Sequence, residues 1–200
     1  MSYSRFTLEK INADFGVELK QGFNLFESVP EAQVRPVIAE LLRDNYPLAQ
    51  AIATEKIKAE LLVAPMLVEM KRLAQGKVSF FSGVDFNVAP KQGLSGFCDF
   101  LISKSPQQFT IEAPVVALVE AKKGELKLGL PQCVAEMIAA RIFNERKGHP
   151  LEPVYGCVTS GNQWGFLKLV DNTALVDSKE YSIENPHKIM GILLSMAGAA

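Results

Sequence analysis

The segment 114–122 constrains the fold of this 200-residue chain more than any other. It reads Pro-Val-Val-Ala-Leu-Val-Glu-Ala-Lys and is almost wholly apolar until its last three residues. A strand with apolar side chains on both faces is typical of the middle of a sheet that is covered on both sides. The segment therefore predicts an α/β domain in which helices flank the sheet.

The periodicity of the remaining chain predicts the other elements. Helical spacing, together with helix start and stop signals, predicts five helices. They cover 8–14, Pro30 to about 44, 48–75, 130–146 and 189–196, and Asn185 and Pro186 provide the start signal for the last of them. We expect Pro65 to kink or divide the long third helix, because proline lacks the N–H that its turn requires. Strand patterns cover 78–88, 96–103, 114–122, 154–159, 163–170 and 174–177.

The order of these elements is α-β-β-β-α-β over a core of about residues 56–170. A helical lead precedes it in 1–47, and a C-terminal hairpin and helix follow it in 171–200. This order predicts a mixed sheet flanked by helices within a single domain, 1–200. A chain of this length buries roughly 70% of its unfolded surface, so it needs no disulfides or structural metal.

Composition excludes several classes of protein. The 21 basic and 22 acidic residues give a net charge of −1, so any contact with nucleic acid must come from a local basic patch. The apolar runs are too short to span a membrane, and the first residues lack a secretory signal, so we expect a soluble cytoplasmic protein. Three cysteines without CxxC spacing are expected in the core, and the presence of only two histidines argues against a catalytic triad or a zinc site.

Charged residues interrupt the apolar pattern at the end of the central strand. Alternation places Glu120 and Lys122 on the same face of that strand. On the preceding strand, Asp99 shares a face with Phe97 and Leu101 and so stands in an apolar row. If the two strands pair as a hairpin, the charged side chains of Asp99, Glu120 and Lys122 converge.

This trio suits metal-assisted phosphodiester hydrolysis. Two carboxylates supply the hard oxygen ligands that Mg²⁺ prefers and leave positions open for water and a phosphate. A bound metal lowers the pKa of its water, and a nearby lysine can orient that water or neutralise charge in the transition state. The spacing alone is a weak signal, since an acidic residue two positions before a lysine also occurs at Glu18, Glu69, Glu125, Glu145 and Asp177.

Three segments resemble the PD-(D/E)XK nuclease superfamily, and more narrowly a bacterial branch of it. They are Gly-Phe-Cys-Asp-Phe at 96–100, Val-Glu-Ala-Lys-Lys at 119–123 and Gln-Cys-Val-Ala-Glu at 132–136, and the element order also matches. The resemblance implies a restriction-endonuclease-like fold. It also implies metal ligation by Asp99 and Glu120 with the Ala121 carbonyl, and a catalytic role for Lys122. Cys98 stands where the superfamily signature has proline.

Helices are expected to add supporting residues. Glu60 occupies an apolar helix face by its spacing and resembles a glutamate that several superfamily branches place before the first core strand; Glu55 is its rival. Gln132 resembles a glutamine that supports the site in related families. Glu136 lies one turn beyond Gln132, and the alternative for it is an ion pair on the helix surface.

We therefore expect a nuclease that uses Mg²⁺, with Mn²⁺ as a substitute, and acts on DNA. The alternative is a catalytically silent domain of the same fold that binds nucleic acid or another protein, its charges forming a structural ion-pair network. No membrane contact is expected. A homodimer would concentrate a basic face that the near-neutral monomer lacks.

Overall fold

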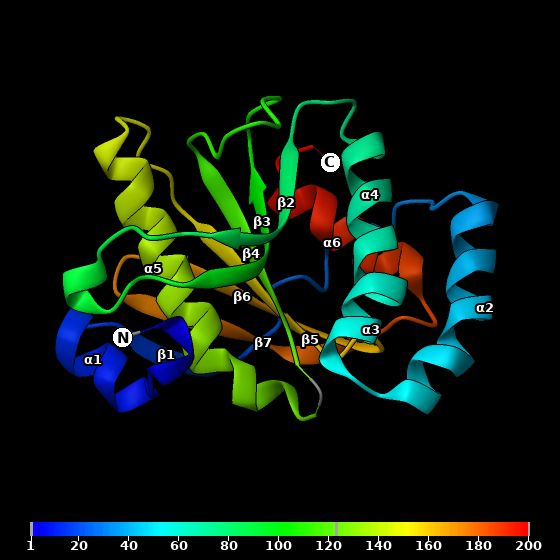
Figure 1. The fold of residues 1–200 in the computed structure, drawn as a ribbon, viewed down its shortest axis with the longest axis horizontal. Helices are drawn as coiled ribbons and strands as arrows, with labels where there is room; N and C mark the ends of the chain where they lie inside the picture. The colour runs from blue at the N-terminus through cyan, green and yellow to red at the C-terminus, as the bar shows by residue number, and fades with distance from the viewer. Residues whose placement is uncertain (1, 123, 200) are drawn as a thin grey trace.

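The computed structural model describes residues 2–122 and 124–199, and Figure 1 shows their fold. The described residues form one mixed seven-stranded sheet in the order β1-β7-β6-β5-β4-β3-β2. Its strands are β1 (Glu18–Phe23), β2 (Ser79–Asp85), β3 (Phe97–Ser103), β4 (Val115–Ala121), β5 (Val154–Thr159), β6 (Gln163–Val170) and β7 (Thr173–Ser182).

Helices cover both faces of this sheet (Figure 1). They are α1 (Leu8–Phe15), α2 (Pro36–Ile52), α3 (Glu55–Lys58), α4 (Ala64–Leu73), α5 (Leu130–Arg146) and α6 (Pro186–Met196). A π-helical turn, Ala59–Val63, joins α3 to α4, and a 3₁₀ turn, Leu126–Gly129, leads into α5. Within the described ranges no helix is both long and apolar enough to cross a membrane.

Strand β4 lies in the interior of the sheet, as its apolar sequence predicts. All seven of its residues are buried, and it pairs antiparallel with β3 and parallel with β5. Val119 packs into the core beneath α4 and α6, whereas Leu118 packs into the core beneath α5. The predicted α/β class, the mixed sheet and the flanking helices are confirmed.

The predicted helix 8–14 is confirmed as α1, but the predicted boundaries of the next two helices are wrong. Helix α2 runs through Pro47 to Ile52, and the chain then breaks at Ala53, whose φ is +54°. Thr54 begins the next helix because its side chain accepts a hydrogen bond from the Ile57 amide. The expected disturbance near Pro65 takes the form of the π-helical turn that precedes it.

Strand β1 lies in the segment 1–47 that we expected to be helical. It pairs parallel with β7 at the edge of the sheet, and five of its six residues are exposed. An exposed edge strand has no buried face, so it leaves no alternating pattern in the sequence. The same reason applies to β7, which extends beyond the predicted 174–177 through the exposed residues Ser178–Glu180.

A buried carboxylate ties the start of α2 to α4. The Glu69 side chain is fully buried and accepts hydrogen bonds from the Arg35 and Arg72 guanidinium groups, and from the Arg35 amide. The Arg72 hydrogen bond outweighs burial, and together with Arg35 it lowers the pKa of Glu69 to about 2. Glu69 is thus a buried carboxylate whose charge is fully paired within the fold.

Candidate active site

Asp99 on β3 lies beside the end of β4, where the other two residues of the predicted trio, Glu120 and Lys122, are found. The pairing of β3 with β4 ends at Phe100 and Val119, and beyond this point the Ala121 amide donates a 2.8 Å hydrogen bond to Asp99 Oδ2. The Asp99 carboxylate therefore takes the place of a backbone acceptor where the two strands part. The apolar row predicted around it is only partly correct, because Phe97 is 65% exposed.

Glu120 and Lys122 form an ion pair on the face of β4 that is covered by α5. The Lys122 Nζ contacts Glu120 Oε1, and it also donates a 3.2 Å hydrogen bond to Gln132 Oε1 on α5. Gly129 lets the lysine stem pass, because a Cβ there would lie 3.0 Å from Lys122 Cγ and 2.6 Å from Val158 Cγ1. The alternation read from the sequence thus places both charges on one face.

Burial and the neighbouring charges shift the pKa values of all three groups. It raises the pKa of Glu120 to about 7, helped by the Asp99 charge and opposed by Lys122. Burial also raises the pKa of Asp99, although the Ala121 amide lowers it in part. Burial lowers the pKa of Lys122, but Glu120, Glu55 and Asp99 together more than offset this and the net shift is upward. Lys122 is therefore a cation at neutral pH, while Glu120 titrates there.

Gln132 and Glu136 extend this network into the core. Gln132 Nε2 donates a 3.1 Å hydrogen bond to Glu136 Oε1, and Glu136 is fully buried. Burial raises the pKa of Glu136 well above its ordinary value, and the Glu120 charge raises it further. The surface ion pair considered for Glu136 is wrong, because α5 is buried on nearly every side between Cys133 and Ala140.

A cleft of about 380 Å³ opens beside Asp99 and Ala121. Glu55 and Glu60 line it from the opposite side, together with Lys56. The predicted apolar surroundings of Glu60 are wrong: its side chain is 57% exposed and lies 3.8 Å from the Lys56 amine. The π-helical turn changes the helical period at this residue, so the 3.6-residue spacing no longer describes its face.

The donor set at this site fits Mg²⁺. Glu120 Oε2 and Glu136 Oε2 are both buried and meet no other donor among the described residues, and the two carboxyl groups lie close enough to share a proton, so a cation that displaced this proton would satisfy Glu120. Mg²⁺ keeps several waters and is commonly held by one or two carboxylates, which Asp99 and Glu120 supply. Over 2–122 and 124–199, no group of three or more His, Cys, Asp or Glu side chains is arranged to hold a metal.

The remaining sequence predictions concern residues outside the trio itself. Cys98, Cys133 and Cys157 are free and buried, as expected of core residues. Lys123, the last residue of the segment 119–123, lies outside the described residues. For Glu136 the sequence leaves a surface ion pair open as an alternative; its position one turn beyond Gln132, between two long apolar stretches, is the signal that favours the site.

The buried glutamates Glu120 and Glu69 should respond in opposite ways to neutralisation. Glu120→Gln removes a carboxylate that burial disfavours, so metal-free stability should stay unchanged or rise. Glu69→Gln weakens a paired carboxylate and should cost about 1–3 kcal/mol. The native pKa of Glu120 is about 7, above its ordinary 4.5, so the Glu120→Gln gain should grow as pH rises from 5 to 8.

Glu69 has the opposite linkage. Its native pKa lies near 2, so its contribution is present above pH 4.5 and is lost as pH falls toward 2. Urea titrations of both variants at several pH values, with EDTA present, measure these effects. A loss of several kcal/mol in Glu120→Gln would show instead that Glu120 is a structural ion-pair residue like Glu69.

Comparison of this chain with protein-family models, with curated proteins and with solved structures finds no match. The function of this site is therefore inferred from its geometry and charge.

Proposed function

We propose that this protein is a Mg²⁺-dependent nuclease of the PD-(D/E)XK type, which hydrolyses phosphodiester bonds in DNA and accepts Mn²⁺ in place of Mg²⁺. The observation that carries the proposal is that the charges of Asp99, Glu120 and Lys122 interact at the end of a buried strand, beside an open cleft that Asp99 and Ala121 line. Burying charges together is costly, and here the carboxylates of Glu120 and Asp99 share one lysine, whereas the structural carboxylate Glu69 is matched by two arginines.

Asp99 and Glu120 would hold the metal with the help of the Ala121 carbonyl. When bound, Mg²⁺ would polarise the scissile phosphate and lower the pKa of a water molecule. The carboxylates of Glu55, Glu60 and Asp99 line the same cleft, so a phosphodiester is repelled there unless a cation is present. Cleavage should therefore depend strictly on added metal.

Lys122 would act on charge rather than as a ligand. The net upward shift of its pKa keeps the amine protonated at neutral pH. An ammonium group beside the reacting phosphate can orient the attacking water and neutralise the charge of the transition state. Gln132 accepts a hydrogen bond from this amine and donates one to Glu136, so it would position Lys122.

The Lys122–Glu120 contact also supports the second candidate function, a catalytically silent domain that binds nucleic acid or protein. In that case the pair is a closed structural ion pair and no metal enters. The two functions differ in one requirement, since only the nuclease needs Glu120 to exchange its lysine contact for a metal.

Cleavage assays on fluorescent single- and double-stranded DNA, with an RNA arm, test the proposal. The expected result is cleavage of DNA in Mg²⁺ or Mn²⁺ and none in EDTA. Binding of DNA without cleavage in either metal would favour the silent domain. Faster cleavage of RNA than of DNA would overturn the substrate assignment but leave the metal-dependent chemistry intact.

A further inference from the structure

Phe97 is an exposed aromatic residue two positions before Asp99 on β3. It is 65% exposed, whereas the next residue, Cys98, is fully buried in the core beneath α5. Neighbouring side chains of a strand point to opposite faces, so Phe97 lies on the face turned away from α5. Asp99 faces the same way and lines the open cleft together with Ala121. The Phe97 ring therefore stands beside this cleft, next to one of its carboxylates.

The backbone that carries Phe97 is held in place. The Gly96 amide donates a 3.0 Å hydrogen bond to Asn87 Oδ1, and the Gly96 carbonyl accepts a 2.8 Å hydrogen bond from the Phe86 amide. Gly96 has a φ of +140° and packs closely on Tyr3, since a Cβ there would lie 3.3 Å from Tyr3 Cδ2. Strand β2 also pairs with β3 as far as Phe97. A ligand that covered this ring would therefore order little additional backbone, which lowers the entropic cost of binding.

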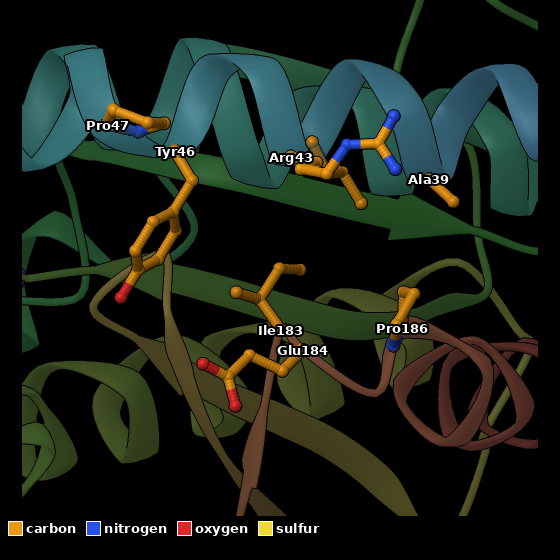
Figure 2. Close-up of a pocket in the computed structure, with 8 residues that line it drawn as sticks. Ala39, Arg43, Tyr46, Pro47, Ile183, Glu184 and Pro186 are labelled. Atoms are coloured by element: carbon orange, nitrogen blue, oxygen red, sulfur yellow. The ribbon is translucent and has the colours of Figure 1, made fainter.

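Other accessible aromatic rings lie away from the cleft. Phe109 is 95% exposed, but it belongs to the loop that follows the opposite end of β3. Tyr46 lines a groove of about 530 Å³ between α2 and the segment 183–186, which Figure 2 shows. Arg43 and Glu184 line the same groove, so its charges are balanced and it attracts no phosphate. Phe97 differs from these rings in its position beside the metal-binding carboxylates.

A nucleotide has the two chemical features that meet at this place. Its charged phosphate suits a metal held by Asp99 and Glu120, and its flat base suits an aromatic ring. Two residues of strand separate Phe97 from Asp99 by about 7 Å, which is within the reach of one nucleotide. Every base has a face that can stack on an aromatic ring, so this contact does not depend on sequence. In a continuous duplex, neighbouring bases cover these faces, and only an unpaired, unstacked base can use the ring.

We infer that Phe97 is a base-stacking subsite beside the reaction centre and that the substrate is single-stranded DNA. This subsite depends on the proposed action on DNA at Asp99 and Glu120, and it adds the form of DNA on which the protein acts.

Oligomers with and without bases test the subsite. A labelled thymidine oligomer and an abasic deoxyribose-phosphate oligomer of the same length carry the same charge, but only the first can stack. In Mg²⁺, Phe97→Ala should weaken binding of the thymidine oligomer by about 5–150-fold and leave binding of the abasic oligomer unchanged. Phe97→Tyr keeps a ring and should bind both as the wild type does. Fluorescence anisotropy in the Lys122→Met background, where cleavage is slow, measures these affinities, and circular dichroism checks folding.

Phe109→Ala is the matched control, since it removes an exposed phenylalanine far from the cleft and should change neither affinity. Annealing the thymidine oligomer to its complement should weaken its binding at least tenfold. Equal losses for both oligomers in Phe97→Ala would indicate a structural effect and overturn the subsite. No loss for either oligomer, or a duplex bound as tightly as the single strand, would overturn the inference as well.

Failure of the proposed function would look different. Base-dependent binding through Phe97 without cleavage by the wild type in Mg²⁺ or Mn²⁺ would support the subsite and assign it to a silent nucleic-acid-binding domain. Cleavage of DNA that Phe97→Ala leaves at the wild-type rate, with unchanged affinity for the thymidine oligomer, would overturn the subsite alone. Binding of neither oligomer by any variant would overturn both.

Discussion

Glu120→Gln should abolish DNA cleavage and weaken Mn²⁺ binding at the same time. The substitution keeps the size of the side chain but removes the negative charge, and an amide oxygen is a far poorer ligand for a hard divalent cation. Glu120 is almost completely buried, so a carboxylate on the protein surface cannot take over its position as a metal ligand. We expect cleavage below detection and Mn²⁺ affinity reduced by at least tenfold.

Asp85→Asn is the matched control for this variant. Asp85 ends β2, which β3 separates from β4, and Asp85 is exposed. Its neutralisation changes the net charge of the protein by the same amount but should alter neither cleavage nor metal affinity. Cleavage assays and metal titrations of both variants give the comparison. A Glu120→Gln protein that cleaves at the wild-type rate would remove Glu120 from the proposed mechanism.

Lys122→Met should separate catalysis from metal binding. Methionine keeps most of the volume of the lysine stem and deletes only the charge. Mn²⁺ affinity should survive or improve, because a cation that contacts Glu120 and competes with the metal has gone. Turnover should fall by about 10²–10³-fold, the usual effect of removing one group that stabilises transition-state charge.

Lys127→Met provides the control for charge alone. Lys127 is exposed and pairs with Glu125 on the turn that leads into α5. This variant has the same net charge as Lys122→Met and should cleave at nearly the wild-type rate. Measured kcat and metal affinity for the two variants then report on position. If Lys122→Met turns over as fast as Lys127→Met, the proposed role of Lys122 is wrong, even where Asp99 and Glu120 still bind metal.

The sequence predicts elements well where packing alone determines the pattern. Strand β4 is buried on both faces, and α5, β5 and β6 have the predicted bounds because apolar periodicity and proline or glycine boundaries agree. Strand β1 shows the opposite case, since its place in the sheet depends on backbone pairing with β7 and not on a buried face.

The site residues were likewise predictable only where a regular pattern in the sequence determines their position. Alternation suffices to place Glu120 and Lys122 together, because both lie on one strand. The surroundings of Glu60 could not be predicted, since a local π-helical turn shifts the register of its helix. Burial of Glu136 depends on how closely α5 packs on the sheet, and an acidic residue in a helix gives no sign of that by itself.

Calorimetric titration of the wild-type protein with Mn²⁺ tests the central claim most directly. The buried Glu120 carboxyl, which titrates near neutral pH, and the nearby Asp99 predict saturable binding that Glu120→Gln weakens at least tenfold and Asp85→Asn retains. Binding should occur without DNA and should weaken below pH 7, where protonation of Glu120 competes with the metal. A wild-type protein that binds no Mn²⁺ at pH 8 would contradict the metal-dependent nuclease and leave the structural ion pair as the account of this site.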